Sequence, residues 1–331
     1  MMMRDVMPAF ALYQPKTLAD AAALAGRHGR DAWLLAGGND SLSWFKDRIK
    51  RPKVVIDLAG IAELRGVRET ADGLEIGAMT TLAEIERHPV IRGRYRLLAD
   101  AAGKTAHPQI RASGTIGGNV SQDTRCWYYR YGLPCYRAGG NTCFSDTPEG
   151  QNREHALFLT RRCVAVSPSD TAPATVALDA TMVIRNGETE RTLAASDFFV
   201  GPEADITRMT ALGPGDILTA IRLPKTFAGA KFHFEKIMDR GVDFPLVNVA
   251  AALKLGSAGT ISDARIVVNA VAAVPYRVRA AEEALRGRPI SADIARIAGQ
   301  VSTHGAKPLN DNGYKIPLMQ NLVMRAVRDA A

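Results

Sequence analysis

The chain has 331 residues, enough for two domains that each bury a core, and its composition of 47% hydrophobic and 23% charged residues is ordinary for a globular protein. No segment reaches the roughly 18 unbroken apolar residues of a membrane helix, and residues 1–15 make a poor secretory signal because Pro8 breaks their apolar stretch. We therefore expect no membrane span and a cytoplasmic location, with export beside a signal-bearing partner left open. The net charge of +8 is scattered without interleaved aromatics, which argues against nucleic acid as a ligand and favours an acidic partner surface.

In chain order, the hydrophobic pattern predicts strands and helices in both halves. Residues 32–58 read as strand, glycine turn, helix and strand, and residues 73–80 read as a strand followed by helices at 81–91 and 95–104. Residues 163–193 predict a strand, a helix and a hairpin that turns at Asn186-Gly187. Beyond a boundary near Pro224-Lys225, we expect strands at 231–238, 246–255 and 261–272, then helices from 277 and 291. The pattern predicts an α+β fold.

Two small-residue turns stand out. The first, WLLAGGNDSLSWFKD at 33–47, places Gly-Gly between a short strand and a helix that Asn39, Asp40 or Ser41 could cap. The second, ASGTIGGNVSQ at 112–122, repeats Gly-Gly-Asn. Either turn alone could be an ordinary strand–turn–helix, and neither is GxGxxG or a P-loop. Together they suggest a diphosphate held between two loops by backbone N–H groups, as a dinucleotide requires.

All four cysteines fall within 38 residues, at Cys126, Cys135, Cys143 and Cys163. Disulfides are rare in large cytosolic proteins, and unrelated core thiols would be scattered along the chain. The spacing has no tight knuckle of the kind that structural zinc sites use, whereas iron–sulfur clusters accept looser spacing. From the residues alone, an iron–sulfur cluster, a zinc site and the absence of metal all stay open, with the cluster favoured.

The motifs in combination resemble the flavin-binding subunits of the molybdenum hydroxylases, the xanthine dehydrogenase family. The resemblance covers about residues 8 to 328, and it rests on two loops, a downstream S-D-x-x-P-A element and a lysine early in the second domain. The matching residues are Ala36, Gly37, Gly38, Asn39, Asp40 and Leu42; Arg111, Gly114, Thr115, Ile116, Gly117, Gly118 and Asn119; Ser169, Asp170, Pro173 and Ala174; and Lys236.

This resemblance implies a vanillyl-alcohol-oxidase-like FAD-binding domain at residues 8–224 and a small α/β sandwich of the CO dehydrogenase flavoprotein type at 228–330. The cysteine segment, about 122–165, is an insertion that resembles one branch of the family, the 4-hydroxybenzoyl-CoA reductases and the bacterial three-subunit aldehyde oxidoreductases. In that branch the insertion carries a 4Fe–4S cluster, which implies that the four cysteines of this chain are cluster ligands.

The resemblance also implies roles for residues around FAD. Asp170 is expected to bind the adenosine part or a nearby water, Ile217 and Leu218 to pack on adenine, and Lys236 to lie near the flavin ring. No catalytic acid or base is implied, and His155 is expected at the surface or behind the cluster ligands. The full set of expected FAD contacts is Leu35, Ala36, Gly37, Gly38, Asn39, Asp40, Ser41, Thr105, Thr115, Gly118, Asn119, Val120, Ser169, Asp170, Ile217, Leu218 and Lys236.

The implied function is that of an oxidoreductase subunit that transfers electrons. Substrate would react at a molybdenum-cofactor large subunit, electrons would cross 2Fe–2S clusters on a small subunit, and FAD and the 4Fe–4S cluster here would exchange them with a ferredoxin-like carrier. Two other classes stay open, a stand-alone FAD-dependent oxidase and a zinc-stabilised binding module without enzyme activity. The residues name neither the substrate nor the direction of electron flow.

Overall fold

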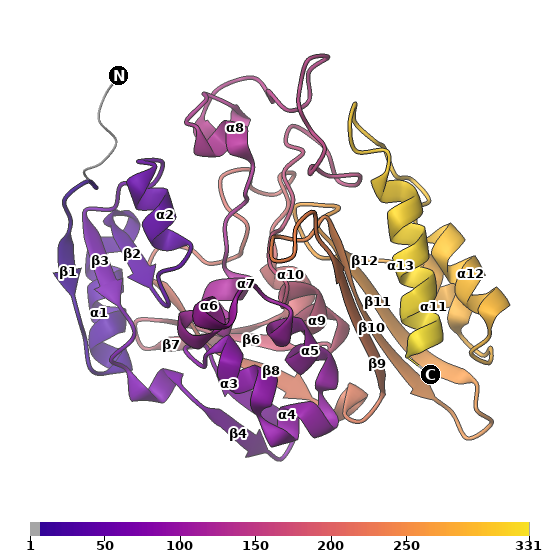
Figure 1. The fold of residues 1–331 in the computed structure, drawn as a ribbon. Coiled ribbons are helices and arrows are strands. Elements are labelled where there is room, and N and C mark those ends of the chain that lie inside the picture. Colours follow the sequence, from indigo (N-terminus) through magenta and orange to yellow (C-terminus); the bar gives the residue numbers. More distant parts are fainter. Residues whose placement is uncertain (1–6, 331) are drawn as a thin grey trace.

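The computed structural model describes residues 7–330, so the first six residues of the segment weighed as a secretory signal lie outside the described part (Figure 1). The chain begins with a three-stranded parallel sheet in the order β1-β3-β2, with α1 packed against it. Helix α1 starts at Thr17, whose hydroxyl accepts a hydrogen bond from the Asp20 N–H and so caps the first turn. The elements are β1 (Ala11–Tyr13), α1 (Leu18–His28), β2 (Ala32–Leu35), α2 (Ser41–Lys46) and β3 (Val54–Asp57).

A five-stranded antiparallel sheet in the order β4-β5-β8-β6-β7 forms the centre of the first half. The predicted hairpin at Asn186-Gly187 is confirmed, and Gly187 has the positive φ of 57° that such a turn needs. The strands are β4 (Val67–Thr70), β5 (Gly73–Gly77), β6 (Thr181–Asn186), β7 (Thr189–Ala194) and β8 (Asp216–Pro224).

Short helices cover this sheet, and two predictions need correction. The expected helix at 81–91 is two helices, because His88 precedes Pro89 and adopts an extended backbone with ψ of 124°. The expected strand at the start of 163–193 does not form; Val164 only accepts one backbone hydrogen bond, from Ala156. The helices are α3 (Leu82–Arg87), α4 (Pro89–Arg94), α5 (Arg96–Gly103), α6 (Pro108–Ser113), α7 (Ile116–Val120), α9 (Ala172–Ala177) and α10 (Ala195–Phe198).

The last third of the chain forms a four-stranded antiparallel sheet in the order β12-β11-β10-β9 (Figure 1). Helices α11, α12 and α13 lie along its outer face, and α5 and α9 contact its inner face. The elements are β9 (Lys231–Ile237), β10 (Val247–Leu255), β11 (Ile261–Asn269), β12 (Tyr276–Arg277), α11 (Arg279–Leu285), α12 (Ala292–Val301) and α13 (Lys315–Asp329). The α+β prediction is confirmed.

Strand β10 contributes to two hydrophobic cores. Val247, Val249, Ala251 and Leu253 belong to the core beneath α13, whereas the alternate residues Ala250 and Ala252 belong to the core of the first half. This alternation follows from the period of two along a strand, so the sheet is covered on both faces.

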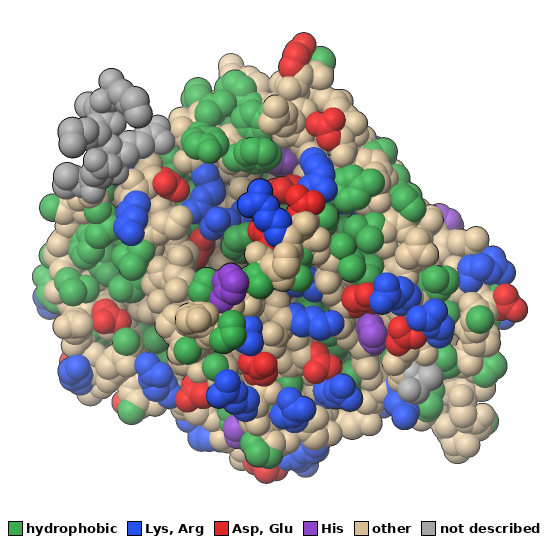
Figure 2. Space-filling model, in the orientation of Figure 1, with side chains coloured by type: hydrophobic (Ala, Val, Ile, Leu, Met, Phe, Trp, Pro, Cys, Tyr) green, Lys and Arg blue, Asp and Glu red, His purple; other side chains and the backbone are tan. Residues whose placement is uncertain are grey.

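The cysteine segment lies between the N-terminal sheet and the start of α13, and its only regular helix is α8 (Trp127–Arg130) (Figure 1). Among residues 7–330, no helix combines the length and the apolar character needed to cross a membrane. Lys and Arg side chains are mixed with Asp and Glu over the face in Figure 2 rather than gathered in one stripe.

Candidate functional site

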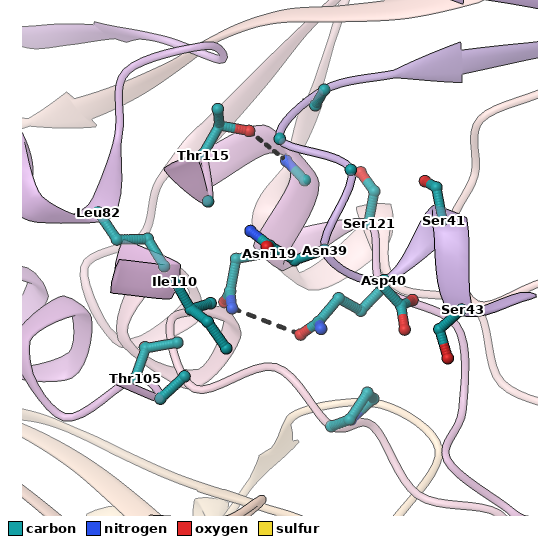
Figure 3. Close-up of a pocket in the computed structure, with 18 of the residues that line it drawn as sticks. Asn39, Asp40, Ser41, Ser43, Leu82, Thr105, Ile110, Thr115, Asn119 and Ser121 are labelled. Carbon is teal, nitrogen blue, oxygen red and sulfur yellow. Dashed lines mark hydrogen bonds between the residues drawn. The ribbon is translucent and has the colours of Figure 1, made fainter. Parts of the chain in front are cut away.

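A cavity of about 430 Å³ lies where the two glycine turns meet (Figure 3). The turn after β2 and the turn into α7 form two of its walls, and the loop between β9 and β10 contributes Val242, Asp243 and Phe244. Eleven of the residues expected to contact FAD line it: Ala36, Gly37, Gly38, Asn39, Asp40, Ser41, Thr105, Thr115, Gly118, Asn119 and Asp170. The structure therefore brings together side chains from segments that lie far apart in the sequence.

The two turns touch each other through their backbones. A Cβ placed on Gly37 would lie 2.2 Å from the Ser113 carbonyl oxygen, so only glycine fits there. Asn39 donates from Nδ2 to the Ser113 hydroxyl at 3.1 Å, which fixes the first turn against the second. Gly38 has a positive φ of 76° and carries the chain through the turn. These contacts explain the glycines of the first turn without reference to any ligand.

Asn119 joins the second turn to the S-D element. Its Oδ1 atom accepts hydrogen bonds from the Ser169 hydroxyl at 2.7 Å, the Thr171 hydroxyl at 2.6 Å and the Thr171 N–H at 3.1 Å. Its Nδ2 atom makes only one long contact, 3.4 Å to Gln122, at the side of the cavity (Figure 3). Asn119 thus holds the cavity wall in place and keeps a donor group free to face the cavity.

Asp170 lines the cavity and forms a buried ion pair with Lys236. The Lys236 Nζ lies 2.7 Å from Asp170 Oδ2, and the Asn248 amide donates to Oδ1 at 3.0 Å. Burial raises the pKa of Asp170 to about 6, against the opposing effect of the Lys236 ammonium. Lys236 itself does not line the cavity; it also donates to the Lys104 carbonyl at 3.3 Å.

The remaining expected FAD contacts stand behind the cavity wall. Ser169 does not line the cavity itself but donates a hydrogen bond to Asn119, which does. Val120 and Leu218 are buried in the central core, and Ile217 is buried in the core beneath the parallel sheet. Leu35 packs beside Trp44. The lining residues that sequence reasoning missed come mostly from the helix turn around 105–110, the lead-in to the cysteine segment and the β9–β10 loop. No local sequence signal indicates that the loop between β9 and β10 returns to the glycine turns.

Asp40 connects this cavity to the cysteine segment. It occupies the predicted N-cap position of α2, but its side chain makes no cap bond. Its carboxylate instead accepts from the Trp44 indole at 3.0 Å and pairs with Arg125 at 3.3 Å and Arg130 at 3.5 Å. Trp44 also packs against Tyr129 of α8, with ring centroids 5.6 Å apart and the ring planes tilted by 55°. The turn after β2 and the cysteine segment are therefore packed as one unit.

All four cysteines line a second, much smaller cavity of about 20 Å³. The aromatic residues Tyr128, Tyr129, Tyr136 and Phe144 enclose it. The four cysteines are free thiols, and within residues 7–330 no group of three or more His, Cys, Asp or Glu side chains is placed to hold a metal ion. Burial and the neighbouring cysteines raise the pKa of Cys126 to about 12, and burial raises the pKa of Cys143 and Cys163.

His155 lies directly behind Cys126 rather than in this small cavity. Its Nε2 is 3.4 Å from the Cys126 Sγ, and its Nδ1 has no hydrogen-bond partner among the described residues. Only 3% of the residue is exposed, and burial together with the Lys315 ammonium lowers the pKa of His155 to about 4. The surface position that was one of the two expectations for His155 is therefore wrong, and a position behind cluster ligands stays a prediction.

Two known protein families match this chain over most of its length. Residues 8–226 match the family described as "FAD binding domain in molybdopterin dehydrogenase", and residues 232–330 match "CO dehydrogenase flavoprotein C-terminal domain". The chain belongs to the FAD-binding medium subunits of the xanthine dehydrogenase and CO dehydrogenase family. Its resemblance to that family, inferred from the two loops and the S-D element, is confirmed at this level.

Individual relatives of this medium-subunit family cover the whole chain. The aldehyde oxidoreductase FAD-binding subunit PaoB of Escherichia coli is 31% identical and spans 98% of this chain and 99% of its own. The carbon monoxide dehydrogenase medium chain of Hydrogenophaga pseudoflava is 30% identical over 98% of both chains. The solved structure of the Hydrogenophaga enzyme matches with a TM-score of 0.78 over 98% of each chain, at 29% identity.

Proposed function

We propose that this chain is the FAD- and 4Fe–4S-containing electron-transfer subunit of a heteromeric molybdenum hydroxylase. Membership of the medium-subunit family supports the flavin half. The observation that carries the cluster half is that four cysteines from a 38-residue segment line one small cavity. We also propose the domain division at 8–224 and 228–330, with the cysteine insertion at about 122–165.

The residues around the larger cavity fit FAD. The cavity walls are two glycine turns in backbone contact, a cradle that a Cβ at Gly37 would disrupt. Backbone N–H groups of the first turn, from Ala36 to Ser41, would hold the diphosphate, and Asn119 Nδ2 would donate to the same part of the cofactor. Asp170 would accept a hydrogen bond from the adenosine part or from a water beside it, while Lys236 would act through Asp170.

The residues around the smaller cavity fit an iron–sulfur cluster better than zinc. The spacing of the four cysteines has no tight knuckle of the kind that structural zinc sites use. A cubane cluster accepts looser spacing, because each thiolate binds a different iron. The enclosing tyrosines and Phe144 would exclude water, which tunes the potential of such a cluster. Metal binding would deprotonate the thiols, including those of Cys126, Cys143 and Cys163, whose pKa values burial raises.

Within a complex, this chain would carry electrons rather than transform substrate. When bound, FAD exchanges electrons singly or in pairs and the cluster exchanges one at a time. We propose that a molybdenum-cofactor large subunit and a 2Fe–2S small subunit stand on one side and a ferredoxin-like carrier on the other, in the cytoplasm. The names of the relatives support this assignment, because they include a medium chain of carbon monoxide dehydrogenase and an FAD-binding subunit of an aldehyde oxidoreductase. Family membership argues against a stand-alone oxidase and a non-enzymatic zinc module.

Metal and cofactor analysis of the anaerobically purified protein tests the proposal. We expect one FAD, four iron and four acid-labile sulfide per chain. Cys135→Ser replaces a soft thiolate with a hard hydroxyl, a poorer iron ligand, so the variant should lose the cluster or retain a three-iron form while it keeps FAD. Asn141→Ser, an exposed change in the same loop, serves as the matched control and should keep both cofactors.

An experiment on the assembled complex then distinguishes a cluster that passes electrons to the external carrier from a cluster that only stabilises the loop. With Cys135→Ser, reduction of the flavin by substrate at molybdenum should survive, and turnover with ferredoxin should fall. Undiminished ferredoxin turnover in a variant without the cluster would rule out a role of the cluster in electron transfer to the carrier. Zinc in place of iron, or flavin without sulfide, would rule out the cluster itself.

A further inference from the structure

The environment of His155 is unusual for a buried histidine. Its two ring nitrogens are inside the protein, and among residues 7–330 the one side chain in hydrogen-bond contact with the imidazole is Cys126, whose Sγ lies 3.4 Å from Nε2. A thiolate sulfur offers lone pairs and no proton, so a hydrogen bond to it requires the proton on Nε2. His155 is therefore placed as a donor to Cys126, whether or not Nδ1 also carries a proton.

The C-terminal domain fixes this placement through the His155 backbone. Lys315 at the start of α13 is fully buried, and its Nζ donates to the carbonyls of Glu154 at 2.8 Å, His155 at 3.1 Å and Ala270 at 2.8 Å. The Asn312 amide donates to the His155 carbonyl as well, at 3.0 Å. Two independent donors thus hold one carbonyl, and they orient the residue whose side chain reaches Cys126.

His155 is not placed to be a ligand. The side chains that line the small cavity include all four cysteines but not His155, so the imidazole approaches Cys126 from outside the cavity. The contact joins the His155 Nε2 to the Cys126 Sγ at 3.4 Å. A donor in that position acts on the charge of the sulfur without occupying a coordination position.

We propose that His155 is a positioning and tuning residue that donates its Nε2–H to the Cys126 thiolate and raises the reduction potential of the cluster. This inference rests on the proposed 4Fe–4S cluster. A hydrogen bond to a ligand sulfur stabilises the reduced state more than the oxidised state, because the reduced cluster holds more negative charge on its sulfurs. The histidine thereby makes the cluster easier to reduce.

EPR-monitored redox titration of the purified complex tests this role. In His155→Phe the ring stays and the N–H is lost, so the cluster potential should shift to a more negative value while the FAD content stays unchanged. In His155→Gln an amide N–H can replace the imidazole donor, and the potential should return toward that of the wild type. His304→Gln, a histidine replacement at an exposed position of the C-terminal domain, should leave the potential unaltered.

A second measurement does not depend on the variants folding. In the reduced wild type labelled with ¹⁵N-histidine, pulsed EPR should detect a weak histidine nitrogen coupling and an exchangeable proton that D₂O removes. An intact cluster without that coupling, or with an unshifted potential in His155→Phe, would overturn the role of His155 and leave the cluster in place. Purified protein without iron and sulfide would instead overturn the proposed cluster, and this inference with it.

Discussion

Replacement of Asn119 by alanine tests how the second glycine turn is held. The Asn119 Oδ1 accepts three hydrogen bonds of 2.6 to 3.1 Å from two hydroxyls and one backbone N–H, all of them buried. At about 1 kcal/mol net for each neutral hydrogen bond, the loss is about 3 kcal/mol, and the unpaired Thr171 N–H adds to it. For a domain of this size, about 3 kcal/mol corresponds to a decrease in Tm of roughly 6–12 °C.

Thermal unfolding of the FAD-free chain, followed by circular dichroism, measures this loss without a contribution from cofactor binding. Flavin fluorescence then reports FAD affinity, which should fall in Asn119→Ala because the cavity wall is no longer joined to Ser169 and Thr171. Gln122→Ala is the control, since it removes only the 3.4 Å contact. A Tm within 2 °C of the wild type would refute the reasoning, because it would mean that the three accepted bonds contribute almost nothing.

Two further predictions concern close packing and a buried charge. Gly37→Ala should abolish FAD binding, because its Cβ would overlap the Ser113 carbonyl; Gly26→Ala, with nothing near its Cβ, should bind FAD normally in the same fluorescence assay. Burial lowers the pKa of Lys315 to about 7 from 10.5, so between pH 7 and 10.5 the unfolded chain binds a proton that the folded chain releases. The free energy of unfolding from urea titrations should therefore rise with pH in that window, by at most about 1.4 kcal/mol per pH unit. Lys315→Met should lose this rise and the exposed-site control Lys307→Met should keep it; equal slopes in all three proteins would contradict the pKa shift.

Local sequence signals predicted the elements and the glycine turns. The hydrophobic pattern located β9, β10 and β11 to within a few residues, and Asn186-Gly187 located the hairpin. The helix at 81–91 was misjudged because a hydrophobic pattern continues smoothly across Pro89, whereas the backbone before proline cannot. The strand expected from Cys163 onward does not form, because this segment is a loop that pairs with no sheet.

Contacts between distant segments were beyond sequence reasoning. Lys236 was expected at the flavin from its position in a motif, but its pairing with Asp170 depends on how β9 packs below the S-D element. Ile217 and Leu218 lie on opposite faces of β8 and therefore enter two different cores. No local sequence pattern distinguishes a residue that packs on adenine from one that packs in a core. The hydrogen bonds of Lys315 to Glu154 and His155 join residues about 160 positions apart, and no local sequence signal at either end predicts them.

The two cores that share β10 restrict how this protein can move. A hinge between the halves of the chain would have to pull Ala250 and Ala252 out of one core while Val249 and Ala251 stay in the other. Such a motion would carry β9 and β11 along with β10 and would expose the apolar face that the sheet shares with the first half. Entry of a dinucleotide by movement of the surface loops disturbs much less of the core, foremost by movement of the segment between β9 and β10, where the Arg125 guanidinium lies over the Phe244 ring.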